Sequence, residues 1–416
     1  MSAAYYNTVC VIGLGYIGLP TAAVLANAGI KVHGVDHSAR VVDIVNAGGI
    51  HIEEANLDIL VQSAVTAGAL EASRVPKTCE TFLIAVPTPL TPDYNADLRF
   101  VFDAVDAIGP YLSTGCKIVL ESTCPVGTTR QVAARIAQQR PDLAVPGYCD
   151  GPADLAIAYC PERVLPGKII EELVSNDRVI GGMTPACAEK VAEFYRRFVE
   201  GQCLCSEAGV AEMVKLSENS FRDVNIAFAN ELSLVAEAMD INVWEVIRLA
   251  NRHPRVAILN PGPGVGGHCI AVDPWFLVSS APQSTRLIRA AREVNDHKAV
   301  HVGNRLKAML NAAPDARLAV LGLAFKPNID DFRQSPAMKI AQDLADYGDR
   351  LMIVEPFANQ LPSALADCGA KLCEMDEAME ACELVAVLVD HELFKRIPPT
   401  VYQGKILYDT RGMWTA

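Results

Sequence analysis

The residue best suited to covalent chemistry is Cys269, in the segment Gly266-Gly267-His268-Cys269. A thiolate is a strong nucleophile, although most cysteines in proteins are buried and inert. Cys269 follows a glycine-rich loop, has His268 beside it and precedes Asp273 by four residues. We therefore expect an exposed thiol with a polar neighbour that can handle a proton.

Lys215 and Asn219 form a second candidate pair, within a run of helix-forming residues from Glu207 to Met239. Residues four apart lie on one face of a helix, so both side chains could address one substrate atom. Simple solvation of a helix surface would also explain such a pair, and it explains Glu218 and Arg222 better than catalysis does. The spacing alone leaves both interpretations open.

Two further pairs resemble parts of metal sites. Cys203 and Cys205 have no second Cys/His pair nearby at a zinc-ligand spacing. His297 and His301 stand four apart, but Lys-Ala-Val separates them in place of the Glu-containing metalloprotease pattern. We expect structural cysteines, a solvated histidine face and no metal.

A glycine-rich turn near the N-terminus indicates a nucleotide site. The turn, Gly13-Leu14-Gly15-Tyr16-Ile17-Gly18, follows an apolar strand at 8–12 and opens a small-residue helix at about 19–28; a strand at 31–35 then ends at Asp36. Gly13 permits the tight turn, Gly15 lets the backbone approach a pyrophosphate, and Gly18 allows close helix packing. Asp36 would accept hydrogen bonds from ribose hydroxyls and repel a 2′-phosphate, which predicts NAD as the cofactor. The alternative is a glycine-rich turn that binds no ligand.

The elements around these motifs predict an α/β fold of two doubly wound Rossmann-like domains joined by a long central helix and helical region. Strands at 81–86 and 117–121 extend the first sheet, and we expect an NAD-binding domain over 1–205. The helix at 207–239, roughly 45 Å long, opens a central region at 206–300 that suits a link between domains or a dimer contact. A loop dense in Gly and Pro interrupts this region at 260–267.

A weaker copy of the first unit begins after Pro314. It has a strand at 317–321, a glycine-led turn, a helix at 337–346 and a strand at 350–354 followed by Glu355. The apolar run at 384–389 supplies another central strand. These elements predict a second Rossmann-like domain over 301–416.

Composition restricts the possible partners. The 416 residues include 36 basic and 49 acidic side chains, a formal net charge of −13, which argues against general binding of nucleic acid or anionic membranes. Thirteen cysteines and a start without a secretory pattern predict reduced thiols in the cytoplasm. The apolar runs are far shorter than the ~20 residues of a membrane helix, so we expect no membrane insertion.

Six motifs, taken together, resemble the UDP-glucose/GDP-mannose dehydrogenase family in order and spacing, over essentially the whole chain. They are the glycine-rich turn with Asp36, Val86-Pro87-Thr88-Pro89, Glu121-Ser122-Thr123-Cys124-Pro125-Val126-Gly127-Thr128-Thr129, Cys160-Pro161-Glu162-Arg163-Val164, Lys215-x-x-x-Asn219, and Gly266-Gly267-His268-Cys269. The resemblance implies oxidation of C6 of a nucleotide sugar to a carboxylate with two molecules of NAD.

Within the family, the segments 161–167, 251–255, 261–269 and 325–331 look like those of the bacterial UDP-N-acetyl-D-mannosamine dehydrogenases. That subfamily makes UDP-N-acetylmannosaminuronate for surface polysaccharide such as enterobacterial common antigen. UDP-glucose dehydrogenases usually carry a second Glu where this chain has Pro166. The alternatives are a UDP-N-acetylglucosamine 6-dehydrogenase, a single-step hydroxyacid dehydrogenase of the 6-phosphogluconate type, and an NAD-binding regulatory protein without catalysis.

The resemblance also implies catalytic roles. Cys269 adds to the aldehyde to give a thiohemiacetal, whose oxidation leaves a thioester that water then cleaves. The remaining catalytic roles fall to Lys215 and Asn219, which stabilise the substrate oxygen; Asp273, which positions Lys215 or a water; Thr123, which holds a water; and Glu162, the base in hydrolysis.

Binding residues are carried over in the same way. Those expected at NAD are Gly13, Tyr16, Ile17, Gly18, Asp36, Thr88, Thr123 and Arg333. Those expected at the UDP-sugar are Arg163, Val164, Lys168, Lys215, Asn219, His253, Arg255, Gly266 and Lys326. Lys168, Arg255 and Lys326 supply the local positive charge that an acidic protein needs for a diphosphate. His253 could reach the sugar or a partner subunit, and the central helix is the expected homodimer contact.

Overall fold

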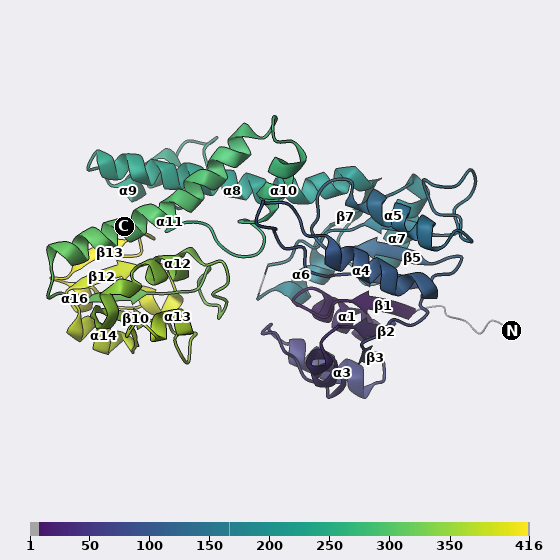
Figure 1. Ribbon diagram of the computed structural model, residues 1–416, viewed down its shortest axis with the longest axis horizontal. Coiled ribbons are helices and arrows are strands. Elements are labelled where there is room, and N and C mark those ends of the chain that lie inside the picture. Colours follow the sequence, from purple (N-terminus) through teal and green to yellow (C-terminus); the bar gives the residue numbers. More distant parts are fainter. Residues whose placement is uncertain (1–7, 166, 415–416) are drawn as a thin grey trace. The chain divides into compact units, whose positions relative to one another are not determined.

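The computed structural model describes residues 8–165 and 167–414. The chain divides into two compact units, one ending at Ser217 and the other beginning at Glu218. Each unit contains one sheet with helices on both faces (Figure 1). The fold is therefore α/β with two Rossmann-like domains, as the sequence predicts.

An eight-stranded sheet forms the first unit, in the order β3-β2-β1-β4-β5-β6-β7-β8. All neighbouring strands are parallel except β6 and β7. The strands are β1 (Thr8–Ile12), β2 (Lys31–Val35), β3 (Leu70–Ser73), β4 (Thr81–Ile84), β5 (Lys117–Leu120), β6 (Ala156–Tyr159), β7 (Arg178–Gly182) and β8 (Cys203–Glu207). The helices are α1 (Gly18–Asn27), α2 (Ala39–Asn46), α3 (Leu57–Thr66), α4 (Arg99–Ile108), η1 (Gly109–Tyr111), α5 (Thr128–Gln139), α6 (Ile169–Ser175) and α7 (Pro185–Tyr195).

Alternation along β1 explains why helices cover both faces of this sheet. Val9 and Val11 point into the core formed with α1, α3 and α7, whereas Cys10 and Ile12 point into the core formed with α4 and α5. A strand buried on both faces reads as a continuous apolar run. Cys10 is fully buried and is a core residue.

The long helix predicted at 207–239 is α8 (Ala208–Ala238), a single helix of 31 residues. The boundary between the two units falls within it. Among the described residues, none of the helices has the length and apolar character needed to cross a membrane.

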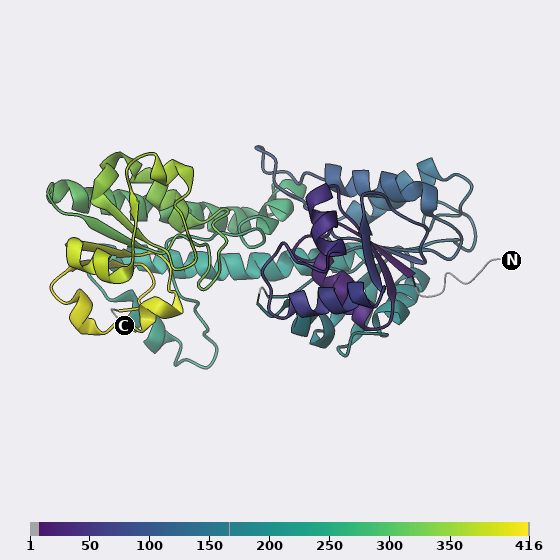
Figure 2. The same ribbon diagram turned by 90° about the horizontal axis from the view of Figure 1, so that it is seen from below.

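The second unit is built on a five-stranded parallel sheet in the order β11-β10-β9-β12-β13. The chain segments that form this sheet are coloured green to yellow in Figure 2. Helices α11 and α12 cover one face, and α14 and α15 cover the other. The strands are β9 (Leu318–Leu321), β10 (Leu351–Val354), β11 (Lys371–Leu372), β12 (Leu384–Val387) and β13 (Ile406–Asp409). The helices are α9 (Val243–Ala250), α10 (Asp273–Ser280), α11 (Arg286–Ala312), α12 (Pro336–Asp343), η2 (Ala345–Arg350), α13 (Ser363–Ala366), α14 (Met375–Ala381), α15 (Glu392–Lys395) and α16 (Pro399–Tyr402).

The helix predicted at 337–346 differs from the observed α12 at both ends. It begins at Pro336 because the Ser335 hydroxyl caps it, accepting a hydrogen bond from the Met338 amide at 3.2 Å. It ends at Asp343, and the chain continues as η2, in which Gly348 has a φ of 56°. The predicted α-helix over 344–346 is therefore wrong.

Candidate active site

The glycine-rich turn between β1 and α1 has the geometry of a pyrophosphate site. Gly13 has a φ of 91°, and a Cβ on it would lie 2.5 Å from the Ala85 carbonyl oxygen. A Cβ on Gly18 would lie 1.8 Å from the Gly13 carbonyl oxygen, whereas a Cβ on Gly15 would meet nothing within 4 Å. The turn thus requires glycine at its two ends and is open in its middle, as NAD needs.

Asp36 closes the same site at the end of β2. Its Oδ2 accepts a hydrogen bond from the Leu14 amide at 3.1 Å, and its Oδ1 accepts one from the Ser38 amide at 2.9 Å. Its side chain remains 13% exposed, so the carboxylate can also reach ribose hydroxyls. Tyr16 and Ile17 lie in the turn itself, and Tyr16 is exposed. These residues fit NAD.

The loops after β4 and β5 meet beside this turn. The Thr88 hydroxyl donates to the Thr123 carbonyl oxygen at 2.6 Å, and the Val86 amide donates to the Ser122 hydroxyl at 3.0 Å. Carboxyl ends of adjacent parallel strands are where open α/β sheets bind ligands. The structure thus brings together Thr88 and Thr123, two of the residues expected at the cofactor.

Glu162, the expected base, follows β6 and is buried. Its Oε2 lies 2.5 Å from a guanidinium nitrogen of the buried Arg178, and its Oε1 accepts a hydrogen bond from the Arg163 amide at 2.7 Å. Both carboxylate oxygens therefore have donors that fix their direction. Arg178 was not among the residues expected from the sequence, because its partner lies 16 positions earlier.

A second buried carboxyl, Glu121, lies near Glu162. The Tyr195 hydroxyl donates to its Oε1 at 2.5 Å, and the guanidinium of Arg178 stands over the Tyr195 ring at 5.5 Å from the centroid. Burial, and then the negative charge of Glu162, raise the pKa of Glu121 to about 7. Glu121 is thus poised to hold a proton beside the ion pair of Glu162, and the sequence motif gave it no role.

The other residues of the first unit that were expected at the substrate lie around α6. The Arg163 guanidinium donates to the Asp177 carbonyl oxygen, and Val164 packs against a small apolar cluster. Lys168 is exposed just before α6, on a segment whose amides at Gly167 and Ile169 donate to the Glu54 carboxylate. Pro166, the position expected to separate this chain from UDP-glucose dehydrogenases, lies outside the described residues.

Glu212 fixes the first turns of α8. Its fully buried carboxylate accepts hydrogen bonds from the Gly127 amide at 2.6 Å, the Thr129 amide at 2.8 Å and the Thr129 hydroxyl at 2.7 Å. It therefore caps the N-terminus of α5 and ties α8 to the loop that carries Thr123. Lys215 follows one turn later and is buried to 8% exposure. Sequence reasoning missed Glu212, because the cap spans 83 residues.

In the second unit, the structure brings together Asn219, Asp273 and Cys269. The Asn219 amide nitrogen donates to the Asp273 Oδ2 at 2.5 Å, and the Asp273 backbone amide donates to the Cys269 carbonyl oxygen at 2.8 Å. Asp273 is 2% exposed and begins α10, whereas Cys269 is exposed. Asp273 thus orients Asn219 on one side and the Cys269 turn on the other.

His268 has a different partner from Cys269. Its Nε2 lies 3.5 Å from the Asp331 Oδ2, and its ring packs edge-on against Phe325. Burial and the positive charge of Arg333 lower the pKa of His268, so the ring is neutral at pH 7. Arg333, expected near the cofactor, pairs with Asp331 through two hydrogen bonds of 2.9 and 2.7 Å.

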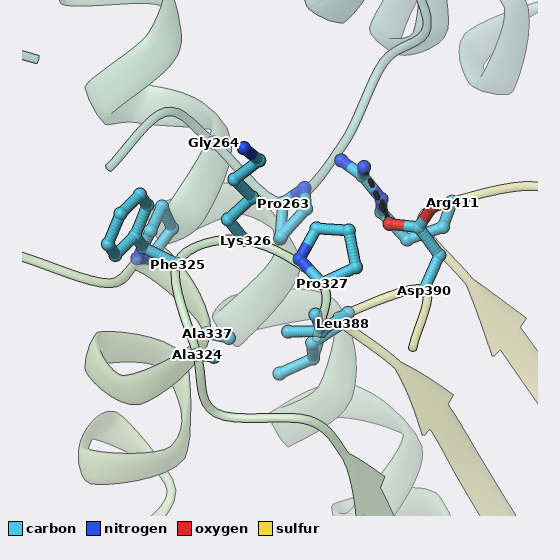
Figure 3. A pocket seen from close by; sticks show the side chains of 12 residues that line it. Pro263, Gly264, Ala324, Phe325, Lys326, Pro327, Ala337, Leu388, Asp390 and Arg411 are labelled. Carbon is cyan, nitrogen blue, oxygen red and sulfur yellow. Dashed lines mark hydrogen bonds and ion pairs between the residues drawn. The ribbon is translucent and has the colours of Figure 1, made fainter. Parts of the chain in front are cut away.

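A pocket in the second unit is lined by two positively charged side chains (Figure 3). Lys326 and Arg411 flank Pro263, and Arg411 donates to the Asp390 carboxylate at 2.8 and 2.7 Å. Gly266 lies next to the same loop, where a Cβ would come within 2.3 Å of the Gln334 carbonyl oxygen. Arg411 was not expected from the sequence. The one local signal was Gly412, which follows it in a turn with a φ of 64°.

The other substrate candidate segment is exposed. The His253 Nδ1 accepts a hydrogen bond from the Arg255 amide at 3.3 Å, and both side chains face solvent. Of the helical histidine pair, His297 is exposed, while the His301 Nε2 lies 2.8 Å from the Glu237 carboxylate. Across 8–165 and 167–414, no group of three or more His, Cys, Asp or Glu side chains could hold a metal ion.

Comparison with known proteins matches the chain to one family. Three domains of the UDP-glucose/GDP-mannose dehydrogenase family match in chain order: the NAD binding domain at residues 7–199, the central domain at 209–297 and the UDP binding domain at 319–416. The matches cover most of the chain.

Curated relatives and solved structures agree with this assignment. A UDP-N-acetyl-D-mannosamine dehydrogenase from Escherichia coli K12 is 51% identical, with 98% of this chain and 99% of that protein covered. An NDP-N-acetyl-D-galactosaminuronic acid dehydrogenase from Ralstonia nicotianae is 50% identical, with 99% and 97% covered. The structure of a UDP-D-ManNAc dehydrogenase from Pyrococcus horikoshii superposes with a TM-score of 0.88 at 35% identity, covering 98% of this chain and 96% of that one.

The glycine-rich turn, the paired loops at Thr88 and Thr123, and the full-length relatives lead to one conclusion. The chain belongs to the UDP-glucose/GDP-mannose dehydrogenase family and is an NAD-dependent dehydrogenase of nucleotide sugars.

Proposed function

We propose that the protein oxidises UDP-N-acetyl-D-mannosamine at C6 to UDP-N-acetyl-D-mannosaminuronate, a four-electron reaction. The observation that carries the proposal is the connected set of Asn219, Asp273 and Cys269, which combines a nucleophile with an oriented amide donor. The names of the relatives in Escherichia coli and Pyrococcus horikoshii support the choice of sugar. When bound, NAD accepts one hydride in each of the two oxidations.

Cys269 makes the second oxidation possible. An aldehyde cannot give up a hydride until a nucleophile adds to it, so the Cys269 thiolate forms a bond to C6 and the aldehyde oxygen becomes the oxygen of a thiohemiacetal. Loss of the remaining hydride from C6 leaves a thioester. Water then adds to the thioester carbon, the bond from sulfur to carbon breaks, and the acid and the thiolate are released.

Asn219 and Lys215 stabilise the oxygen through these steps. Asp273 accepts one N–H of the Asn219 amide, which leaves the second N–H oriented for the alkoxide and thiohemiacetal oxygens. Lys215 adds a positive charge for the same atom. Asp273 also positions a water or Lys215, Thr123 holds the hydrolytic water, and Glu162 receives its proton. Arg178 holds Glu162 in position for that transfer.

Local cations offset the net charge of −13 at the diphosphate. Lys168, Arg255 and Lys326 are the proposed contacts, and the pocket geometry adds Arg411 beside Lys326 (Figure 3). Arg163, Val164, His253 and Gly266 complete the proposed substrate set. Arg333 remains a proposed cofactor contact.

The identity of the sugar is the first point to test. N-acetylmannosamine and N-acetylglucosamine differ only at C2, and N-acetylgalactosamine differs from N-acetylglucosamine only at C4. The relative from Ralstonia nicotianae makes the galactosamine sugar a specific alternative. NADH formation measured with UDP-N-acetylmannosamine, UDP-N-acetylglucosamine, UDP-N-acetylgalactosamine and UDP-glucose should favour the first; a clear preference for another sugar contradicts the proposal.

The covalent scheme is tested by counting electrons. Wild-type enzyme should form two NADH per sugar, and a Cys269→Ser variant should lose formation of the acid. Two NADH per sugar at an unchanged rate in that variant would exclude the thioester and favour a scheme without a covalent intermediate. NAD binding with no sugar-dependent NADH from any nucleotide sugar would favour the regulatory alternative.

We also propose a homodimer through α8. Phe221, Phe228 and Val235 are exposed at 69, 52 and 50% and recur every seven residues, which aligns them along one side of the helix. An exposed apolar stripe of this kind supports the proposal of an interface. Light scattering of the wild type should give twice the chain mass, and Phe228→Glu should give the monomer mass. A monomeric wild type contradicts this proposal.

The cellular role follows from the resemblance alone. We propose that the enzyme acts in the cytoplasm and that its product enters a surface polysaccharide of the enterobacterial common antigen type. The names of two relatives, which contain N-acetylhexosamine sugars, support a role in supplying sugars of this class.

A further inference from the structure

The second unit holds a buried carboxylate–imidazole pair that no proposed catalytic step uses. Glu355 follows β10, His391 lies just beyond β12, and both side chains are 0% exposed, with the His391 Nε2 3.3 Å from the Glu355 Oε2. The same Oε2 accepts hydrogen bonds from the Leu323 amide at 2.7 Å and the Ala324 amide at 3.2 Å. Glu355 therefore fixes the start of the loop that leaves β9.

His391 fixes the same loop a few residues later. Its Nδ1 accepts a hydrogen bond from the Asn328 backbone amide at 3.0 Å. Because Nδ1 is an acceptor, the ring proton lies on Nε2 and is donated to Glu355. The ring thus bridges Glu355 to Asn328 and uses both of its nitrogens.

Asn328 occupies a conformation that few side chains adopt. Its φ is 63°, in the left-handed region, and its Oδ1 accepts a hydrogen bond from the Glu392 amide at 3.0 Å. Lys326 lies between the two fixed points of the loop, Ala324 and Asn328, and lines the pocket (Figure 3). The direction of Lys326 is therefore set by backbone hydrogen bonds on both sides.

The residue before His391 acts on the opposite side of the pocket. Asp390 accepts hydrogen bonds from the Arg411 guanidinium at 2.8 and 2.7 Å. Two consecutive residues after β12 thus hold both pocket cations, one directly through a carboxylate and one through the loop.

We propose that His391 is a positioning residue for substrate binding: by bridging Glu355 to Asn328 it holds Lys326 beside Arg411 before the UDP group of the substrate arrives. The inference rests on the proposed function, since it assigns the UDP group to this pocket. A loop that is ordered in advance loses little conformational freedom on binding, so the bridge increases affinity without taking part in the chemistry.

Two variants of His391 separate its two hydrogen bonds. His391→Gln keeps a donor for Glu355 but removes the acceptor for the Asn328 amide, whereas His391→Asn keeps an acceptor near the position of Nδ1. For His391→Gln we expect UDP affinity, measured by titration calorimetry, to fall about tenfold, the effect of losing one partly buried hydrogen bond. NAD affinity and kcat should stay within about twofold of wild type while KM for the UDP-sugar rises; His391→Asn should recover most of the loss. His297→Gln, an exposed histidine on α11, is the matched control.

The outcomes distinguish the inference from the proposed function. Wild-type protein that does not bind UDP contradicts both. Wild-type protein that binds UDP, with a folded His391→Gln variant of equal affinity and equal KM, contradicts the inference alone. A parallel fall in kcat and NAD affinity would indicate general structural damage and also contradicts it.

Asn328 offers a test that leaves the buried pair intact, because it is exposed. Asn328→Gly and Asn328→Ala both keep the backbone donor to His391 and both lose the contact to Glu392. Only alanine strains the left-handed conformation. We expect weaker UDP binding for Asn328→Ala than for Asn328→Gly, by several-fold. Equal affinities would show that the fixed loop conformation does not matter and would overturn the inference.

Discussion

The two Rossmann-like halves use the same turn for different purposes. Gly13 after β1 and Gly322 after β9 both have a φ of 91°. In each half, an acid at the end of the next strand accepts a hydrogen bond from the amide that follows this glycine: Asp36 from Leu14, and Glu355 from Leu323. The strand, the turn and the acid are thus repeated.

The surroundings of the two acids differ. Asp36 keeps 13% of its side chain exposed, whereas Glu355 is fully buried beneath His391. In the first half the helix starts at once, with Gly18, but in the second half Pro327 stands at the same offset and α12 begins only at Pro336. One acid is thus open to a ligand, and the other is part of the scaffold that holds the loop carrying Lys326.

Substitution at Gly18 should give the largest effect. Its Cβ would lie 1.8 Å from the Gly13 carbonyl oxygen, so Gly18→Ala must displace the turn and should destabilise the first unit by on the order of 4 kcal/mol. Gly15→Ala is the matched control, because space beside Gly15 is open. It should leave stability nearly unchanged and weaken only NAD binding. Urea unfolding and NAD titration measure the two effects; similar stability losses would contradict the assigned geometry.

Removal of the two acids should separate stability from cofactor binding. Glu355→Ala leaves His391 and three backbone amides without their acceptor, and we expect a loss of about 3 kcal/mol in unfolding free energy with no direct effect on NAD affinity. Asp36→Ala should cost less stability. An equal loss of stability in the two variants would show that Glu355 and Asp36 do not differ in their structural roles.

Glu121 extends the comparison to a buried acid with few donors. Its pKa is raised to about 7, so the folded protein holds this proton from about pH 4.5 to 7 while the unfolded chain has released it. The contribution of Glu121 to the unfolding free energy therefore falls as the pH rises from about 4.5 to 7. Glu121→Gln retains an acceptor for Tyr195. Its unfolding free energy relative to wild type should therefore rise by about 3 kcal/mol as the pH rises from about 4.5 to 7.

Unfolding of wild type and Glu121→Gln at several pH values measures this change, and a difference independent of pH would contradict it. Glu355 should behave in the opposite way. Burial opposes ionisation of Glu355, but the hydrogen bond from His391 and those from backbone amides lower its pKa below the ordinary value. Its contribution to stability is therefore present above the unfolded pKa and is lost as pH falls through the folded pKa.

The smallest effect is expected in cofactor choice. Asp36→Ala removes the proposed acceptor for the ribose hydroxyls and the charge proposed to repel a 2′-phosphate. NAD affinity should fall about tenfold, while NADP affinity stays constant or rises. Kinetics with both cofactors test this, and an unchanged preference for NAD would show that Asp36 only supports the turn.

Most of the fold follows from local sequence. The strands at 8–12 and 31–35 agree residue for residue with β1 and β2. The first is an almost continuous apolar run, as is typical of a strand buried on both faces. The second, Lys31-Val32-His33-Gly34-Val35, follows from its place between the first helix and Asp36. The start of α12 was misplaced by one residue although Ser335-Pro336 is a typical helix start.

The network that supports the site did not follow from the sequence. Arg178, Glu212 and His391 act through partners 16, 83 to 85 and 36 or 63 residues away. Only the folded topology brings such pairs together. Motif residues such as Gly13 and Asp36 could be predicted from the sequence, because one turn and the strand next to it determine their positions.

The carboxylate of Glu212 has a consequence for anion selectivity. A helix N-terminus with exposed amides attracts any small anion, including phosphate and sulfate. At α5 the amides of Gly127 and Thr129 are already neutralised by a carboxylate from the protein itself. Inorganic phosphate therefore finds these two amides already bound to Glu212. The start of α5, two strands away from the glycine-rich turn, is thus a poor competing site for the pyrophosphate of the cofactor.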